Sequence, residues 1–316
     1  MVQTGSDVGV AFALNFAAGF ATVLGGMVVF SKRLVHLANP ASLAIALSIS
    51  SGVMLFISFV EIFGEAVHLL TEGIMTEGMD PDTAHGHGWL AATACFLAGI
   101  LLIYVIDFFV HKFAPETSAT EIENLEHLRE SFEQNEQIKS PGYIEAQTPG
   151  LALKISEDAK AKLNRMGLLS ALAIGIHNVP EGIATYVGAI QNTSVGLSLA
   201  IGIGLHNIPE GIAVAAPIYF ATGSRWKGIM WCCVSAFAEP VGGFIAWLAI
   251  GDGMDSVSEG VLFGLVCGIM VCICVKELLP TAFKFAQGKT QLVALGMFAG
   301  MFIMVTSLIL FAYAGV

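Results

Sequence analysis

Long runs of apolar residues, separated by short polar connections, dominate the pattern of this chain. A helix of about 20 residues crosses a hydrocarbon core of roughly 30 Å. Only helices or closed barrels can span a bilayer, because every backbone polar group there needs a partner within the protein. The runs are too long and too continuously apolar for barrel strands, so we predict an all-α, polytopic membrane protein. The eight predicted spans are 8–30, 42–70, 89–110, 167–190, 195–220, 227–250, 258–282 and 290–314.

The Lys and Arg residues fall on one side of this predicted bundle. Of the 14 basic residues, all but Lys276 lie in the connections between spans 1 and 2, 3 and 4, 5 and 6, and 7 and 8. Basic connections face the cytoplasm, so both termini are expected on the extracytoplasmic side. We expect a single membrane domain over 1–316, with a long cytoplasmic connection over 111–166. The plasma membrane is the expected location.

Composition supports a membrane protein and narrows its partners. Apolar residues make up 55% of the chain and charged residues 12%, with a mean hydropathy of +0.76. A soluble domain carries about a quarter charged residues. No cluster of basic residues suggests a nucleic-acid face. The lipid bilayer is therefore an expected partner and nucleic acid is not.

The six cysteines all fall in apolar stretches. None has the paired CxxC spacing of a zinc finger or a redox motif. We interpret them as small residues that face the core or the lipid. A role as a soft metal ligand for Cys272 or Cys274 is the alternative.

One polar motif occurs twice, inside neighbouring predicted spans. Residues 175–184 read GIHNVPEGIA and residues 204–213 read GLHNIPEGIA. His177 lies about ten residues, or roughly 15 Å of helix, into span 4. The second motif reaches a similar depth in span 5 from the other side, and Glu239, in FAEPVGG, reaches it in span 6. The sequence therefore places three carboxylates near the middle of the bilayer.

Carboxylates at this depth need a counter-charge. A midplane acidic residue costs about 2.5–3.5 kcal/mol on insertion scales, and one divalent cation would neutralise two of them. The His and Glu of each motif are four residues apart and share a helix face, while the proline between them frees a backbone carbonyl one turn back. Imidazole with carboxylate suits Zn²⁺, Fe²⁺ and Mn²⁺ better than Ca²⁺ or Mg²⁺. The candidate metal ligands are His177, Asn178, Glu181, His206, Asn207, Glu210 and Glu239. The alternative is that these side chains hydrogen-bond between helices and fix the bundle.

HNVPEG followed by HNIPEG, with AEP in the next span, resembles the ZIP (Zrt-, Irt-like protein) family of metal transporters, in its GufA/ZupT-like branch. The resemblance covers nearly the whole chain. It implies metal transport toward the cytoplasm. It also implies an eight-helix bundle in which spans 1–3 and 6–8 form an inverted repeat around spans 4–5.

The same resemblance implies a binuclear metal centre. One site would comprise His177, Glu181, His206 and Glu210. The second would comprise Asn178, Asn207 and Glu239, with Glu181 and Glu210 able to bridge the two ions.

Further acidic residues inside the spans are candidates for the ion path. Glu61 and Glu65 lie four residues apart in the outer half of span 2, with His68 nearby, and could form an entrance. Asp107 and Glu277, near the cytoplasmic ends of spans 3 and 7, resemble exit residues of the family. The alternative for each is an interfacial or ion-paired group without a role in transport.

We expect a transporter that exposes its midplane site alternately to the two sides. Zinc is the first expected substrate, with Fe²⁺, Mn²⁺ and Cd²⁺ as alternatives, and no cofactor is expected besides the bound ion. A metal-gated channel or sensor is one alternative. A membrane di-metal enzyme is another, but the chain lacks an HExxH motif, so we expect no enzymatic activity. A homodimer is an open alternative to a monomer.

Overall fold

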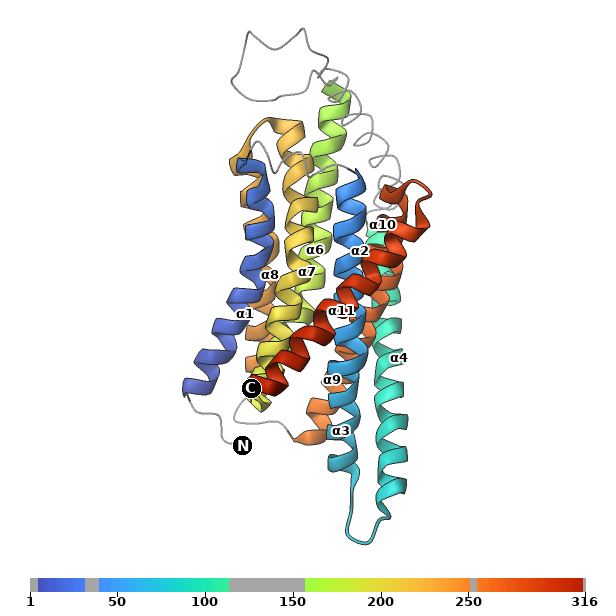
Figure 1. The fold of residues 1–316 in the computed structure, drawn as a ribbon. Helices are drawn as coiled ribbons and strands as arrows, with labels where there is room; N and C mark the ends of the chain where they lie inside the picture. Colours follow the sequence, from blue (N-terminus) through green and yellow to red (C-terminus); the bar gives the residue numbers. More distant parts are fainter. Residues whose placement is uncertain (1–4, 32–39, 114–156, 251–254, 315–316) are drawn as a thin grey trace.

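The computed structural model describes residues 5–31, 40–113, 157–250 and 255–314. Every regular element within these residues is helical, which confirms the predicted all-α bundle (Figure 1). Six of the eight spans are single helices, with a short 3₁₀ turn after the first. They are α1 (Gly5–Gly26) with η1 (Met27–Phe30), α4 (Pro81–Phe113), α6 (Glu157–Gln191), α7 (Thr193–Thr222), α8 (Arg225–Ile250) and α11 (Thr290–Ala314). Most of the predicted cytoplasmic connection, 114–156, lies outside the described residues.

Spans 2 and 7 each consist of two α-helices joined by a π-helical turn. In span 2, α2 (Pro40–Phe56) continues through η3 (Ile57–Ile62) into α3 (Phe63–Ile74). In span 7, α9 (Ser256–Ile273) continues through η4 (Cys274–Leu278) into α10 (Leu279–Ala286). Single π turns inside α-helices often mark functional sites. Hydropathy predicted the two spans but not their interruptions.

Seven helical segments among the described residues are long and apolar enough to cross a membrane. They include every predicted span except the fourth. The fourth, α6, has 35 residues and is long enough, but it begins with the polar stretch EDAKAKLNR and is less apolar as a whole. With α6, the bundle has the eight predicted spans.

Tight, capped turns join several of the helices. The Asn192 side chain accepts a hydrogen bond from the Ser194 backbone N–H at 2.9 Å and caps α7. Asp255 accepts one from the Ser258 N–H at 2.8 Å and caps α9. Gly223, with φ of 68°, ends α7 in the left-handed conformation that glycine tolerates. Such short connections hold α6, α7 and α8 as antiparallel neighbours.

The two ends of the bundle differ in their connections. The first turn of α1, the last turn of α11 and the α3–α4 turn lie at one end (Figure 1). The α7–α8 and α10–α11 turns, which are flanked by Arg225 of α8 and Lys284 of α10, lie at the opposite end. An even number of spans places the first and last helix ends at the same end of the bundle, as observed.

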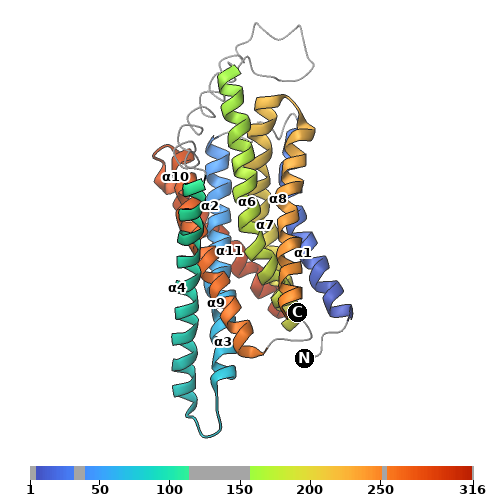
Figure 2. The ribbon, with the colours of Figure 1, turned by 180° about the vertical axis from the view of Figure 1, so that it is seen from behind.

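Helix packing repeats between the two halves of the chain. α1 packs against α7 as α8 packs against α6, and α2 packs against α11 as α9 packs against α4. The central helices α6 and α7 pack against each other, and both views show them side by side (Figure 2). The largest buried apolar cluster joins α2, α6 and α9 through residues such as Met54, Tyr186 and Phe263. The pattern agrees with the inverted repeat around spans 4 and 5.

The two motif helices meet their neighbours at glycines. A Cβ on Gly182 of α6 would lie 1.9 Å from the Glu239 backbone oxygen of α8. A Cβ on Gly211 of α7 would lie 1.9 Å from the Thr22 backbone oxygen of α1. Any side chain would force these helices apart, so the last glycine of each HNxPEG motif permits close backbone contact. Which helices these glycines meet could not be predicted from the motif.

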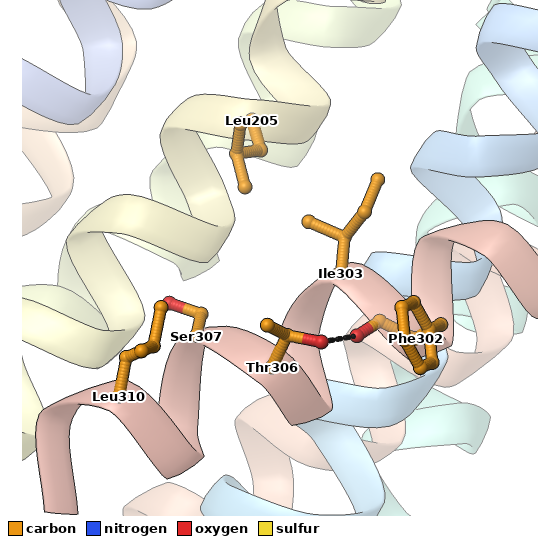
Figure 3. A pocket seen from close by; sticks show the side chains of 6 residues that line it. All are labelled: Leu205, Phe302, Ile303, Thr306, Ser307 and Leu310. Carbon is orange, nitrogen blue, oxygen red and sulfur yellow. Dashed lines mark hydrogen bonds between the residues drawn. The ribbon is translucent and has the colours of Figure 1, made fainter. Parts of the chain in front are cut away.

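A pocket of about 350 Å³ opens between α7 and α11 (Figure 3). It is lined by Leu205, Phe302, Ile303, Thr306, Ser307 and Leu310. Phe302 and Leu310 are more than 60% exposed, as expected for side chains that face lipid. The hydroxyl of Thr306 donates to the Phe302 carbonyl of its own helix at 2.8 Å. The mainly apolar lining is unsuited to a metal ion.

Candidate metal site

All seven predicted ligands lie in the interior of the bundle. Three come from α6, three from α7 and one from α8. They are His177, Asn178, Glu181, His206, Asn207, Glu210 and Glu239, none of which is more than 7% exposed. Charged and amide side chains are rarely buried to this degree unless they are paired or bind a ligand. The two motifs and Glu239 are therefore all buried in the bundle, and their common depth in the membrane stays a prediction.

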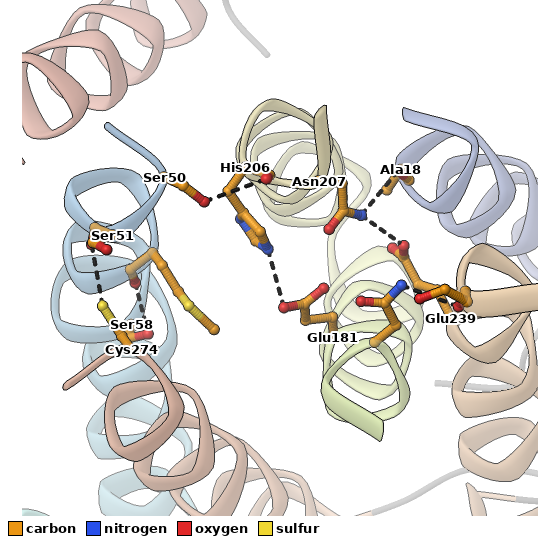
Figure 4. A network of polar contacts seen from close by, with 12 residues as sticks. Ala18, Ser50, Ser51, Ser58, Glu181, His206, Asn207, Glu239 and Cys274 are labelled. Carbon is orange, nitrogen blue, oxygen red and sulfur yellow. Dashed lines mark hydrogen bonds and ion pairs between the residues drawn. The ribbon is translucent and has the colours of Figure 1, made fainter. Parts of the chain in front are cut away.

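Two side-chain contacts connect the motifs to each other and to α8 (Figure 4). His206 Nε2 lies 3.0 Å from Glu181 Oε1, which joins α7 to α6. Asn207 Nδ2 donates to Glu239 Oε2 at 3.1 Å, which joins α7 to α8. Glu210 is also buried and lies one turn after His206 on α7. The side chains of the two motifs thus form one polar cluster.

The two asparagines are oriented by backbone carbonyls of flanking helices. Asn178 Nδ2 donates to the Ser235 carbonyl of α8 at 3.2 Å. Asn207 Nδ2 donates to the Ala18 carbonyl of α1 at 3.1 Å. A carbonyl can only accept, so the nitrogen of each amide faces the flanking helix. The amide oxygen of each is then left for another partner.

Five buried oxygen atoms in the cluster have no hydrogen-bond partner among the described residues. They are Asn178 Oδ1, Glu181 Oε2, Asn207 Oδ1, Glu210 Oε2 and Glu239 Oε1. A buried acceptor without a partner costs roughly 1–3 kcal/mol, and more when it is charged. A cation bound among these oxygens would give several of them a partner at once. The donor set is suited to a divalent transition metal because imidazole nitrogens lie beside the oxygens.

The side chains are joined in pairs and do not form a closed coordination shell. In the part of the chain that the structure describes, no group of three or more His, Cys, Asp or Glu side chains is arranged to hold a metal ion. The contact between His206 and Glu181 occupies one ligand atom of each. The predicted division into two metal sites stays a prediction.

Two polar residues outside the motifs support the cluster, and neither was predicted from the sequence. Asn15 of α1 is fully buried and donates through Nδ2 to the Gly182 carbonyl at 2.7 Å. Ser50 of α2 donates through Oγ to the His206 carbonyl at 3.3 Å (Figure 4). Both contacts reach the backbone near a helix-interior proline, where regular helical hydrogen bonding is interrupted. Asn15 had a usable signal, because it is an isolated amide inside the first apolar run.

Glu277 extends the cluster toward the basic end of the bundle. Glu277 lies in η4, and its Oε2 is 3.2 Å from His177 Nε2. Its side chain is 33% exposed, whereas that of His177 is 9% exposed. The structure therefore brings this predicted exit residue into contact with the first motif and with a more accessible region.

The remaining candidates lie apart from the cluster. Glu61 in η3 and Glu65 in α3 are both half-buried. His68 is exposed and lies 3.7 Å from Glu72 on its own helix. Asp107 belongs to α4, and its side chain lies outside the described residues. The path roles of these residues stay predictions.

The cysteines fit the structural interpretation. All six are free thiols. The Cys274 thiol donates to the Ser51 carbonyl at 3.5 Å (Figure 4), and the Cys267 thiol donates to the Ser58 carbonyl at 3.0 Å. Cys274 is thus engaged with span 2 in this conformation. Cys272 is buried, and its alternative role as a soft ligand stays open.

Comparison with known proteins identifies similar sequences along nearly the whole chain. The family described as "ZIP Zinc transporter" matches residues 8–308. The chain is 40% identical to "Zinc transporter ZupT" of Streptococcus mutans over 303 residues, which are 95% of this chain and 97% of that protein. The protein of the same name from Lysinibacillus sphaericus is 40% identical over 96% of this chain and 98% of its own length. That of Chlorobaculum parvum is 38% identical over 95% and 97%.

Proposed function

The chain belongs to the ZIP zinc transporter family, and from this premise we propose that it carries Zn²⁺ across the membrane toward the cytoplasm. It is a multi-pass integral membrane protein of a non-enzymatic family. The names of its relatives support zinc as the substrate. Fe²⁺, Mn²⁺ and Cd²⁺ are alternative substrates with the same preference for mixed nitrogen and oxygen ligands.

The proposed binding site for the ion is the polar cluster of the two HNxPEG motifs and Glu239. The observation that carries this assignment is the set of five buried oxygens without partners among the described residues, beside two imidazoles. One ion would bind His177, Glu181, His206 and Glu210. A second would bind Asn178, Asn207 and Glu239, with Glu181 and Glu210 bridging. Both atoms of the contact between His206 and Glu181 would have to turn toward the ion, so ion binding would be coupled to a local rearrangement of these two side chains.

Alternating access follows from placing this site between two related halves. η4, which contains Glu277, leads through α10 to the α10–α11 turn, and η3, which contains Glu61, leads through α3 to the α3–α4 turn. The basic residues at the first end favour the cytoplasm. Both termini would then face outward, and zinc would enter past span 2 and leave past span 7. The plasma membrane is the proposed location.

Zinc uptake into proteoliposomes tests the proposal. The unmodified chain should give saturable uptake, and Glu181→Ala or His177→Ala should reduce its initial rate by about tenfold or more, as expected when a ligand essential to the transported state is lost. Glu77→Gln, in the exposed α3–α4 turn, is the control and should leave uptake unchanged. Normal uptake in both motif variants would refute the site. Uptake that never saturates with zinc would favour a channel.

A further inference from the structure

The two spans that contain π turns are related in sequence as well as in shape. Residues 51–62 read SGVMLFISFVEI and residues 267–278 read CGIMVCICVKEL. The two segments align without a gap and share four identical residues at equivalent places. The pairs are Gly52 and Gly268, Met54 and Met270, Ile57 and Ile273, and Glu61 and Glu277. Glu61 in η3 therefore corresponds to Glu277 in η4.

Packing around these segments supports the same correspondence. A Cβ on Gly52 of α2 would lie 2.1 Å from the Met297 carbonyl oxygen of α11. A Cβ on Gly268 of α9 would lie 2.0 Å from the Phe96 carbonyl oxygen of α4. Equivalent glycines thus make equivalent close contacts in the two halves, and each lies in the helix that leads into a π turn.

Two thiol contacts join the related segments to each other. In the alignment, Ser51 corresponds to Cys267 and Ser58 corresponds to Cys274. The Cys267 thiol donates to the Ser58 carbonyl, and the Cys274 thiol donates to the Ser51 carbonyl. Exchanging the two segments turns one residue pair into the other, although the donating thiol comes from span 7 in both, so equivalent positions of the two segments contact each other.

The motif helices are related by the same exchange. Asn178 of α6 bonds to the Ser235 carbonyl of α8, and Asn207 of α7 bonds to the Ala18 carbonyl of α1. In the inverted repeat, span 1 (α1) corresponds to span 6 (α8). The relation that exchanges span 2 with span 7 therefore also exchanges α6 with α7. Under it, the His of the first motif corresponds to His206.

The two halves differ in how these equivalent residues are paired. Glu277 is paired with His177 at 3.2 Å. His206 is paired at 3.0 Å with Glu181 of the opposite motif. Within the described residues, Glu61 makes no ion pair with His206, whose imidazole is paired with Glu181. The carboxylate of Glu277 is therefore in contact with the polar cluster of the two motifs, and that of Glu61 is not.

We propose that Glu61 is the outer counterpart of Glu277, and that it pairs with His206 in the opposite conformation of the transport cycle. In that conformation Glu277 leaves His177, and His206 leaves Glu181. By the same relation His177 then pairs with Glu210, the counterpart of Glu181, so each buried imidazole keeps a carboxylate partner in both conformations. Leaving either one without a partner would be costly. This inference rests on the proposed transport function and adds a specific residue contact to it.

Cross-linking of paired cysteines tests the predicted contact. One variant carries Glu61→Cys and His206→Cys, and a reference variant carries Glu277→Cys and His177→Cys. The six native cysteines are replaced by alanine in a background that retains zinc uptake. A protease site inserted within 114–156 allows the full chain to be cut after treatment with a short bifunctional thiol reagent, so that cross-linked fragments stay together on a denaturing gel. Glu72→Cys with His206→Cys is the negative control, because Glu72 is exposed on the outer turn of α3.

The expected result is a cross-link in both the Glu61–His206 pair and the Glu277–His177 pair, and none in the control. Conditions that increase one cross-link should decrease the other, because the two contacts belong to alternative conformations. Absence of the Glu61–His206 cross-link in a folded variant, whatever the reference pair does, would overturn the inference. So would cross-links that always rise together.

A second measurement needs no cysteine background. Glu61→Gln and Glu277→Gln, each in the otherwise native chain, should lower the rate of zinc uptake by about tenfold, since each removes one of the exchanged contacts. Glu61→Asp should restore part of the rate, and Glu72→Gln should leave it unchanged. Wild-type uptake by Glu61→Gln would overturn the inference while leaving the transport function intact. Absence of zinc uptake by the unmodified chain would instead refute the proposed function, and cross-linking would still report whether the two contacts exchange.

Discussion

Asn15 shows how a residue outside the motifs can hold the site in place. Its amide nitrogen reaches the carbonyl of Gly182, the residue that follows Glu181. The contact anchors α1 to the first motif at the point where α6 is interrupted by Pro180. An isolated amide in an apolar helix has few alternative partners there, so we infer that its main role is to position the backbone of the motif.

We predict that Asn15→Ala destabilises the protein by about 1 kcal/mol, the net contribution of a typical buried hydrogen bond. It should also lower zinc uptake, because Glu181 would be less firmly positioned. Thermal unfolding in detergent and uptake by proteoliposomes measure the two effects. Thr306→Ala is the matched control, since this exposed hydroxyl bonds within α11 and its loss should cost less than about 0.5 kcal/mol. Equal stability of the Asn15 and Thr306 variants would contradict the assigned role.

At the residue scale, the sequence singled out the metal-binding candidates most clearly, and their role as ligands stays a prediction. The HNxPEG repeat indicated its own chemistry, because ionisable side chains inside a bilayer are rare and usually line a path or bind a ligand. Burial of all seven residues agrees with that interpretation. The supporting contacts of Asn15 and Ser50 could not be predicted, because they depend on which face of α1 and α2 meets the motif helices.

At the scale of elements, close helix contact explains the glycines of the motifs. α6 and α8 approach so closely that the Gly182 position has no room for a methyl group. The approach brings Glu239 beside the first motif, whose Asn178 bonds to Ser235 one turn away on α8. Gly182 therefore sets the spacing of α6 and α8 and, through that spacing, the position of Glu239 beside the first motif.

We predict that Gly182→Ala destabilises the bundle by about 1–3 kcal/mol, the usual cost of inserting a methyl group into a packed interior. Gly175→Ala on the same helix is the matched control. A Cβ at Gly175 has its nearest neighbour at 3.8 Å, and alanine favours helix over glycine by about 0.5–1 kcal/mol. Thermal unfolding should show the first variant less stable and the second unchanged or more stable. The reverse order would contradict the close contact.

Helices were predicted from apolar runs with little ambiguity, but the π turns in spans 2 and 7 were not. Hydropathy records which residues are apolar and carries no information on hydrogen-bond register. The internal match of 51–62 with 267–278 is visible in the sequence when the two halves are compared. It is a weak signal, because most of the equivalent positions hold different apolar residues.

At the scale of the whole molecule, the arrangement of the ends supports the proposed direction of transport. The α3–α4 turn lies at the end of the bundle that holds the first turn of α1 and the last turn of α11. The Arg225 and Lys284 turns lie at the other end, which the positive-inside rule assigns to the cytoplasm. The extent of the 111–166 connection and the oligomeric state stay predictions, because most of that connection lies outside the described residues and a single chain contains no partner.

We predict that a cysteine at Glu77, in the α3–α4 turn, is labelled from outside intact cells by a membrane-impermeant thiol reagent. A cysteine at Ser224, in the α7–α8 turn, should be labelled only after permeabilisation. Both variants are made in the background without native cysteines, which serves as the unlabelled control. Labelling of the Ser224 variant alone in intact cells would show that the orientation is inverted.

The most direct test of the central claim is X-ray absorption spectroscopy at the zinc edge of the purified, zinc-loaded protein. A site built from the motif residues predicts a shell of nitrogen and oxygen at about 2.0–2.2 Å, with imidazole among the ligands and no sulfur. His177→Ala should reduce the imidazole signal or the amount of bound zinc. A shell with sulfur at about 2.3 Å, or an unchanged spectrum in the His177 variant, would contradict the claim that the HNxPEG cluster holds the ion.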